Sequence, residues 1–488
     1  MKSCRASEGP APLLRAFVLA AITLYPIWFT IHYRAVYDPD IWWHMRAGEW
    51  VLQNHAVPHT DWLSTAGQGK PWVLYSWIFD ALVATLYRVF GLFGPIILYP
   101  VVMVVMISGA LWAVVAELGL HFWQRTLVIA ASLLALAPIC SPRPGLFSVL
   151  FLATELALVL HSRRTDSVVP LCALPLLFWV WANIHVQFVY GLFVLGLFVL
   201  EPWMERWLDR TSGVSEFQAR RVGTLELVFG FCITATLINP YFLGLYKVIV
   251  GLATQTGQYQ YISELQPPTF RSLNSIVELC MIVAAWALLV LHRKFRWVPV
   301  TFLMVGTVFA FRTVRDVWFG VLAALVALAW PTKQFEPHSL HERWPVLAAA
   351  AFLVVTGAVL IGATHPLGQR ELWKDTGDEF PVAAVEYIKN KNLPGPLFND
   401  WNWGGFLTWA LPEIPVYVDS RTNLPGDEVL ERSIAVWSGA PGWAEDPALS
   451  KARLIVANRN NSLASLLRFD PRFRVLYEDG TAVVFVKP

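Results

Sequence analysis

The number and length of the apolar stretches constrain the fold of this chain most. About a dozen stretches are long enough to cross a hydrocarbon core of ~30 Å as helices. Of the 488 residues, 56% are hydrophobic and 15% are charged, against roughly a quarter charged in ordinary soluble chains. The sequence therefore predicts a polytopic α-helical membrane protein with about 11–13 spans.

Basic residues in short loops indicate which ends of the spans face the cytoplasm. The basic clusters lie at 163–164, 206–221, 292–296 and 333–343, and pairs of apolar runs separate them, as expected if all four are cytoplasmic. The net charge of +2 is therefore no sign of a nucleic-acid partner. We expect a multi-pass protein of the plasma (inner) membrane with a cytoplasmic N-terminus.

One region does not fit this alternation. Three apolar runs, near 72–90, 95–117 and 124–140, lie between the first outward loop and Pro142-Arg143-Pro144. Both flanks are expected outside, which requires an even number of crossings. Either one run dips in without crossing or the boundaries are wrong, and the sequence does not decide between these.

The sequence changes character after about residue 365. Residues 1–365 form the predicted membrane domain, with an outward first loop at about 32–71, whereas in 366–488 amphipathic helix-like runs alternate with short β-like runs. This alternation predicts a small α/β domain on the periplasmic or extracellular side. The predicted strands are 396–398, 416–418, 454–456, 474–477 and 483–486.

Two carboxylates follow the first apolar run. Asp38 and Asp40 flank Pro39, which favours extended backbone at the residue before it, and in extended chain residues two apart point to the same side. Both can therefore converge on one cation or one reacting hydroxyl, which makes them candidate active-site residues. The alternative is that Asp40 only caps the helix at about 41–54 and that Asp38 is a solvated loop charge.

The helix that follows these carboxylates is predicted to lie in the membrane interface. It carries Trp42, Trp43 and Trp50 beside a polar side, a pattern typical of interfacial helices. His44 stands one turn beyond Asp40. It is a candidate ligand or phosphate contact, with a purely structural histidine as the alternative.

Later outward loops supply further charged candidates. Glu264 lies in a long polar stretch, and such stretches are often functional, although an exposed loop glutamate is the alternative. Arg312, Arg315 and Arg143 are candidates for binding a phosphate, because a guanidinium can donate to two of its oxygens. The alternative for the first two is a snorkelling arginine paired with Asp316.

A tryptophan-rich motif lies in the C-terminal part. Trp401, Asn402, Trp403 and the later Asp419 combine flat apolar faces with hydrogen-bonding groups, as carbohydrate- or peptide-binding surfaces do. A strand-to-helix turn with the glycine pair at 404–405 would give the same sequence for structural reasons. Both interpretations stay open at this stage.

The layout resembles the GT-C superfamily of integral-membrane glycosyltransferases. These have a first span, an outward loop with an acidic motif, many further spans and often an outward C-terminal domain. Several segments are similar to a group of bacterial members: 38–49, 57–61, 69–72, 239–241 and 399–422. A looser similarity to the catalytic subunit of oligosaccharyltransferases rests on the acidic loop and on Ile262-Ser-Glu264, whereas 400–403 departs from their Trp-Trp-Asp motif, which puts peptide recognition in doubt.

The resemblance implies an enzyme that moves a sugar from a polyprenyl-phosphate- or pyrophosphate-linked donor to a glycan, lipid or protein acceptor at the cell envelope. It implies Asp38 as general base or metal ligand, and Asp40 and Glu264 as further metal ligands. The three arginines would hold the donor phosphate. Any metal would be Mg²⁺ or Mn²⁺, which oxygen ligands suit.

Other functions fit the sequence less directly. An oligosaccharide or polymer-block transferase is the alternative within the enzymes. A lipid or solute transporter is disfavoured, because we find no Gly/Pro-broken spans in corresponding halves and the ionisable residues gather at outward loops. A non-catalytic scaffold that presents the C-terminal domain is the third possibility.

Overall fold

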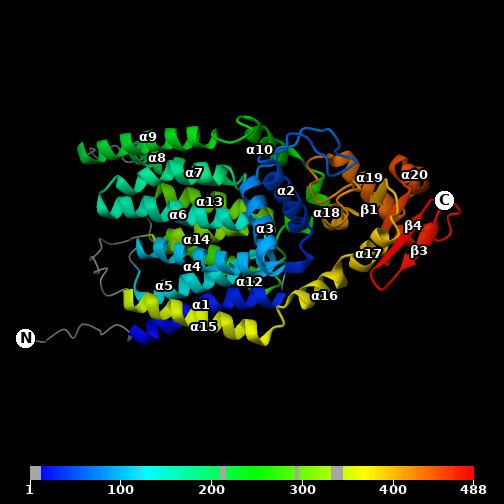
Figure 1. The fold of residues 1–488 in the computed structure, drawn as a ribbon. Coiled ribbons are helices and arrows are strands. Elements are labelled where there is room, and N and C mark those ends of the chain that lie inside the picture. The colour runs from blue at the N-terminus through cyan, green and yellow to red at the C-terminus, as the bar shows by residue number, and fades with distance from the viewer. Residues whose placement is uncertain are drawn as a thin grey trace, which may run out of the picture.

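A helical bundle with a mixed α/β part at one end makes up the computed structural model (Figure 1). The structure describes residues 12–33, 35–118, 120–208, 216–291, 296–330 and 344–487. Within these ranges, six helices are long and apolar enough to cross a membrane: Pro12–Tyr33, Gly94–Ala116, Phe122–Ile139, Gly145–Thr165, Leu273–Leu291 and Val346–Thr364. Five shorter apolar helices accompany them: Val169–Ala182, Phe188–Met204, Gly223–Thr236, Gly244–Thr254 and Trp297–Arg312. The predicted polytopic class is confirmed, while the number of crossings stays a prediction.

The bundle is built around one fully apolar helix. Nearly every residue of α14 (Val317–Ala329) is buried, as expected of a helix that is hydrophobic on all sides. Helix α13 (Trp297–Arg312), α12 (Leu273–Leu291) and α5 (Phe122–Leu136) pack against it. The remaining bundle helices are α1 (Pro12–Tyr33), α4 (Tyr99–Ala116), α6 (Gly145–Thr165), α7 (Leu174–Ala182), α8 (Phe188–Leu208), α9 (Glu216–Thr236), α10 (Gly244–Thr254) and α15 (Trp344–Thr364).

The structure resolves the odd number of apolar runs after the first loop. Helix α3 (Trp77–Phe90) has 14 residues and stands with α2 (Asp40–Asn54) across the end of the bundle, whereas α4 and α5 run along it (Figure 1). The run near 72–90 is therefore the one that does not cross. This leaves two crossings between the first loop and Arg143, as parity requires.

The two ends of the bundle carry different charged groups. Arg143 lies just before the start of α6, while Arg163 and Arg164 lie in its last turn. The predicted cytoplasmic arginines therefore sit at the end opposite the Asp38 loop. The basic clusters at 292–295 and 333–343, and most of that at 206–221, lie outside the described residues, so the orientation in the membrane stays a prediction.

The C-terminal part contains a four-stranded sheet in the order β1-β2-β4-β3. Its strands are β1 (Leu397–Asn399), β2 (Leu454–Asn458), β3 (Arg474–Glu478) and β4 (Ala482–Val486). The pair β1 and β2 is parallel and the other pairs are antiparallel. Around the sheet lie α16 (Gln369–Glu379), α17 (Val382–Asn390), α18 (Trp401–Ala410), α19 (Asp427–Ser438), α20 (Pro447–Lys451) and α21 (Ser462–Leu467).

One predicted strand is placed differently. Residues 416–418 do not join the sheet; Val416 pairs instead with Ser64 of the first outward loop. The Thr65 N–H donates to the Val416 carbonyl over 2.7 Å. The prediction was wrong here because the apolar run finds its partner in a loop about 350 residues earlier, a pairing that local sequence cannot show.

Helix α2 is also more buried than an interfacial helix would be. Trp42 is fully buried and Trp43 nearly so. The Trp42 ring packs among aromatic side chains of α16, α18 and the segment between α16 and α17, namely Trp373, Phe380, Phe406 and Trp409. The C-terminal part therefore covers α2, and these tryptophans are core residues.

Candidate functional site

Three carboxylates from two loops converge on Arg143. The Arg143 Nε donates to Asp38 Oδ2 over 2.6 Å and its Nη2 to Asp38 Oδ1 over 3.2 Å. Asp40 Oδ2 lies 3.3 Å from the same Nη2, and Nη1 donates to Glu264 Oε2. The guanidinium thus uses both edges of its fork, the geometry that suits paired carboxylates.

Local backbone structure fixes each of these groups. The Asp40 N–H donates to Asp38 Oδ1 over 3.0 Å, so Asp38 caps the start of α2 while its other oxygen binds Arg143. The Arg143 turn is short and lies between two prolines, and the Tyr99 hydroxyl donates to its carbonyl over 2.8 Å. Both loops therefore have fixed positions before any substrate arrives.

Glu264 joins a second arginine to this cluster. It lies in the single turn η5 (Ser263–Leu265), and its Oε1 accepts from Arg315 Nη2. The Val314 N–H donates to the Gln266 carbonyl over 3.0 Å, which holds the two loops side by side. Arg315 therefore pairs with Glu264 and not, as the alternative interpretation had it, with Asp316.

The surroundings push the pKa values of the two aspartates in opposite directions. Burial, the largest effect, raises the pKa of Asp38 despite the nearby Arg143. Burial also acts to raise the pKa of Asp40, but Arg143, the Ser420 hydroxyl and other neighbours outweigh it and lower that pKa. Two carboxyl groups with separated pKa values can take different roles in acid–base chemistry.

Exposure also separates the two aspartates. The Asp38 side chain is 4% exposed and Asp40 is 20% exposed. Asp40 Oδ1 accepts from Trp43 Nε1 over 3.2 Å. Asp40 is therefore the aspartate that a substrate hydroxyl can reach.

Three further residues belong to the site and were missed from the sequence. Ser420 lies against Asp40. Tyr75 lies close enough to Arg315 and Asp40 to feel their charge, and burial raises its pKa to about 12. No motif marks Ser420 or Tyr75, whereas His185 was noticed only as a polar residue at an outward turn. Its pKa is lowered to about 3 by burial and then by Arg315.

His44 lies beside the cluster and has a structural partner. It is buried, and its Nδ1 lies 2.5 Å from Asp80 Oδ1. The Ser76 hydroxyl donates to the same carboxylate. The structural interpretation of His44 therefore describes its contacts.

The other residues of the Arg315 turn are separate from the carboxylates. Arg312 lies over the Tyr259 ring, 4.8 Å from its centroid. Asp316 is buried and accepts from Gln187, Tyr190 and Thr313. The structure thus brings Arg315 to the cluster and leaves Arg312 on a neighbouring aromatic face.

The tryptophan motif around α18 divides into surface and buried residues. Asp400 caps α18 by accepting from the Asn402 N–H over 2.9 Å, so the strand-to-helix turn is present. Asn402 is exposed and Trp401 half-buried, whereas Trp403 is buried and donates to the Glu379 carbonyl over 3.0 Å. Trp403 therefore has no face for an acceptor.

Asp419 belongs to a buried ion-pair cluster. Arg421 Nη2 lies 2.5 Å from Asp419 Oδ2, and its Nη1 lies 2.9 Å from Asp61 Oδ1 in the first outward loop. The guanidinium also lies 4.3 Å from the Trp72 ring centroid. Asp419 is saturated by these contacts, and the cluster connects the C-terminal part to the first loop beside Asp40.

The carboxylates fit Mg²⁺ or Mn²⁺ by type but not by arrangement. The Arg143 guanidinium lies between Asp38, Asp40 and Glu264. Over the described ranges, no group of three His, Cys, Asp or Glu side chains could hold a metal ion. The arrangement therefore does not fit a resident metal among these three carboxylates.

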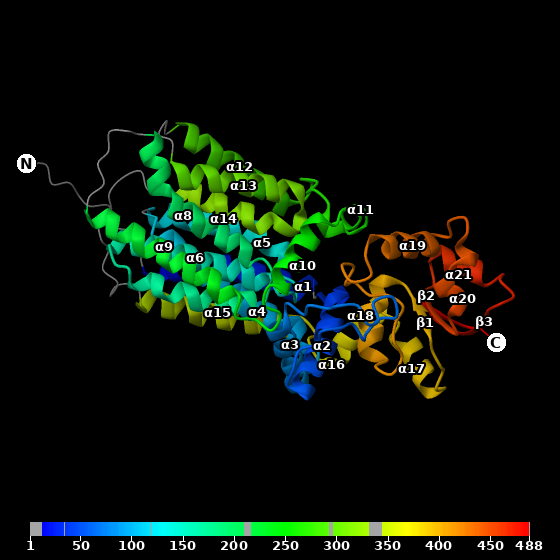
Figure 2. The same cartoon turned by 90° about the horizontal axis from the view of Figure 1, so that it is seen from above.

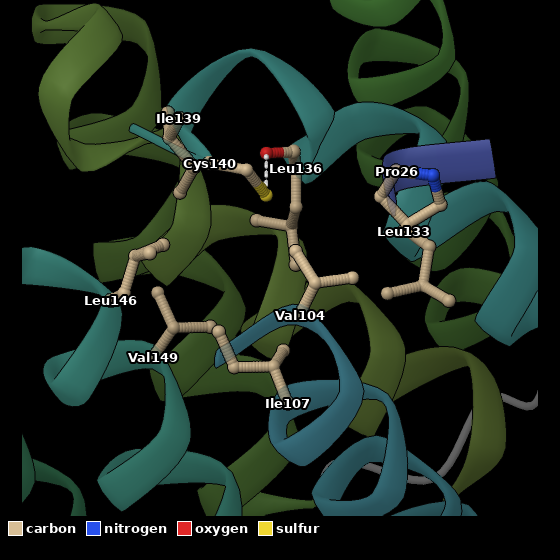
Figure 3. Close-up of a pocket in the computed structure, with 9 residues that line it drawn as sticks. All are labelled: Pro26, Val104, Ile107, Leu133, Leu136, Ile139, Cys140, Leu146 and Val149. Atoms are coloured by element: carbon tan, nitrogen blue, oxygen red, sulfur yellow. Dashed lines mark hydrogen bonds between the residues drawn. The ribbon is translucent and has the colours of Figure 1, made fainter. Parts of the chain in front are cut away.

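An apolar cavity adjoins the turn that carries Arg143. It encloses about 270 Å³ of space between helices of the bundle (Figure 3). Cys140 and Leu146, which flank the Arg143 turn, both line it. The other lining side chains are Pro26, Val104, Ile107, Leu133, Leu136, Ile139 and Val149.

Together, fold and site define a multi-pass helical membrane protein with a charged cluster at one end of its bundle and a mixed-sheet C-terminal part. The chain is similar in structure to ArnT from Cupriavidus metallidurans, in a crystal structure bound to undecaprenyl phosphate, with a TM-score of 0.50 and 14% identity over 96% of this chain and 97% of that one. At this identity the likeness shows the fold, and the predicted GT-C-like architecture is confirmed. No protein-family model and no curated protein matches the chain.

Proposed function

We propose that this protein is a membrane glycosyltransferase that transfers a sugar from a polyprenyl-phosphate-linked donor to an acceptor on the outer face of the membrane. The observation that carries the proposal is the convergence of Asp38, Asp40, Glu264, Arg143 and Arg315 beside an apolar cavity. The ArnT structure of the same fold holds a polyprenyl phosphate, which supports this class of donor. The outward orientation rests on the basic loops.

The donor would place its phosphate at the arginines and its lipid in the apolar region. Arg315 is 42% exposed and Arg143 is 26% exposed, so both can reach a ligand. Arginine suits this role, since it binds phosphate oxygens in pairs. The cavity below the Arg143 turn could take the first isoprene units, because it is lined without polar groups.

Asp40 would act as the general base. The acceptor hydroxyl oxygen forms a bond to the anomeric carbon while the bond from that carbon to the phosphate oxygen breaks. Asp40 takes the hydroxyl proton, and the phosphate leaves with the electron pair, stabilised by Arg315 and Arg143. Asp38, which the sequence favoured as base, would hold Arg143 and the start of α2 in position.

The acceptor would approach from the C-terminal part. Helix α18 packs on the site loop, since a side chain at Gly405 would overlap the Pro39 carbonyl. Trp401 and Asn402, at the start of the same helix, are the members of the tryptophan motif that reach the surface. We propose these two as acceptor contacts, with a glycan, lipid or protein as acceptor class.

Comparative mass spectrometry tests the proposal in cells. Envelope glycans, glycolipids and glycoproteins are compared between cells lacking the protein, cells complemented with it, and cells complemented with the Asp40→Asn variant. We expect one glycosylated species to disappear without the protein and to return only with the unaltered chain. Full restoration by Asp40→Asn would contradict the catalytic assignment, and an unchanged profile would contradict the function.

A further inference from the structure

Glu264 contacts two arginines in the way a phosphate would. One carboxylate oxygen accepts from Arg143 Nη1 and the other from Arg315 Nη2. Each oxygen therefore serves a different guanidinium. A phosphate group also presents oxygens to two guanidiniums at once, so Glu264 occupies the place where a donor phosphate would be held.

The two arginines depend on Glu264 to different degrees. Arg143 already makes two hydrogen bonds to Asp38 and an ion pair with Asp40. In the part of the chain that the structure describes, Glu264 is the acid that forms an ion pair with Arg315. Glu264 is 27% exposed, in contrast to the enclosed Asp38, so this end of the cluster is the accessible one.

The segment that carries Glu264 is attached to its neighbours mainly near its ends. Residues 255–272 hold only the short turns α11 (Gln258–Tyr261) and η5. At one end, the Gln255 side chain and the Gly257 N–H donate to Asp427 of α19 over 2.6 and 2.9 Å. Figure 2 shows α10 and α11 at the end of the bundle that faces α19. Glu264 can therefore move without displacing a membrane helix.

We propose that Glu264 is an internal anion that closes a two-arginine phosphate subsite, and that the donor phosphate displaces it. This inference rests on the proposed function and adds its regulation. The exchange conserves charge, because a sugar joined to a lipid by one phosphate is a diester with one negative charge, as is the carboxylate. After transfer, Glu264 competes with the lipid phosphate for the arginines and so promotes product release.

Binding of farnesyl phosphate to the full-length protein in nanodiscs tests this inference. We compare the unaltered chain with Glu264→Gln, Arg315→Ala and the double variant. The matched control is Glu478→Gln, which removes an ion pair with Arg468 in the C-terminal part. We expect Glu264→Gln to bind about tenfold more tightly and Arg315→Ala about tenfold more weakly, with the gain from Glu264→Gln lost in the double variant and no change in the control.

The outcomes separate the two proposals. Unchanged or weaker binding by Glu264→Gln, together with weaker binding by Arg315→Ala, would overturn displacement and leave the arginine subsite standing. Binding that is insensitive to Arg315→Ala and to Arg143→Ala would overturn the subsite and with it the proposed donor site. A gain equal in Glu264→Gln and in the control would also overturn the inference.

Hydrogen exchange on the unaltered chain gives a second measurement that needs no variant. Farnesyl phosphate should increase amide exchange in residues 258–266, because Glu264 leaves its partners, and should decrease it in the Arg143 turn. Inorganic phosphate at the same concentration separates recognition of the phosphate group alone from recognition of the lipid phosphate. Increased protection of 258–266 would contradict displacement.

Discussion

At the scale of single residues, Arg143 organises the site. Its guanidinium connects Asp38 and Asp40 of the first loop with Glu264 of a later loop. Because these carboxylates are at least partly buried, they need a positive partner. The chemistry proposed here therefore depends on an arginine and not on a cation.

Removal of divalent metals should leave the transferase activity of the purified protein unchanged. The physical reason is that Arg143 occupies the position between the carboxylates that a metal would take. Activity is measured after treatment with a chelator and again after adding Mg²⁺ or Mn²⁺. Loss on chelation with recovery on adding either ion would contradict this prediction.

His185 should make stability depend on pH. Its Nδ1 lies 2.8 Å from the Ser148 hydroxyl, which also accepts from Trp181 Nε1 over 2.9 Å, so neutral His185 accepts from Ser148. Its pKa of about 3 in the fold lies below ~6.5 in the unfolded chain, which therefore binds more protons between these values. Stability should fall as pH falls, by about 1–2 kcal/mol between pH 7 and pH 5.

Thermal unfolding of the detergent-solubilised protein against pH measures this effect. The variant His185→Gln should lose part of the decrease in melting temperature below pH 6.5. The exposed His55 supplies the control variant His55→Asn, which should keep the full decrease. Identical pH profiles for all three proteins would contradict the assignment.

Residue-level prediction from sequence succeeded where the charge pattern was local. Asp38 and Asp40 stood out because of the proline between them, and Arg143 because it lies between prolines at a span boundary. Arg421 and Ser420 did not stand out, since the Arg421 contact to Asp61 joins residues 360 positions apart. Such proximity is set by packing of the whole chain, which no local pattern encodes.

At the scale of elements, the close packing of α18 on the first loop positions Asp40. Gly405 has no room for a side chain beside the Pro39 carbonyl, and Gly404 has none beside Val418 and Asp419. The glycine pair in the sequence suggested a turn. Its structural role is instead the close approach of a helix to two neighbouring segments.

The substitution Gly405→Ala should reduce transfer activity at least tenfold. The added methyl group would push α18 from Pro39 and shift Asp40, and overpacking of this kind costs about 1–3 kcal/mol. Activity and melting temperature are measured together. The control is Gly109→Ala in α4, where an added Cβ meets no neighbouring atom; equal effects of both substitutions would contradict the packing argument.

Element types were predictable to a large extent. Helices at about 41–54, 382–388, 428–436 and 463–467 were predicted and correspond to α2, α17, α19 and α21. The failure of 416–418 as a sheet strand and the burial of Trp42 have one cause. Apolar periodicity shows that a face is covered but not what covers it.

At the scale of the whole molecule, buried charges join the C-terminal part to the first loop. Arg421 is 3% exposed and contacts Asp61, Asp419 and Trp72. The backbone bonds between 63–66 and 416–417 lie beside it. The C-terminal part therefore helps to build the site, as well as lying next to it.

Replacing Arg421 with methionine should loosen this connection. Two buried carboxylates lose their partner, which costs about 3–5 kcal/mol. Limited proteolysis should then cut the first loop faster, and the melting temperature should fall. The control Arg468→Met removes an exposed pair with Glu478, worth about 0–1 kcal/mol; similar behaviour of the two variants would contradict the role of Arg421.

The central claim is that Asp40 performs chemistry at a site built on Arg143, and in vitro sugar transfer tests it most directly. Purified protein in nanodiscs is supplied with a polyprenyl-phosphate-linked sugar and the acceptor found by mass spectrometry. We predict that Asp40→Asn lowers kcat about 10²–10⁴-fold while farnesyl phosphate still binds. Unimpaired transfer by Asp40→Asn in a folded protein would contradict the account.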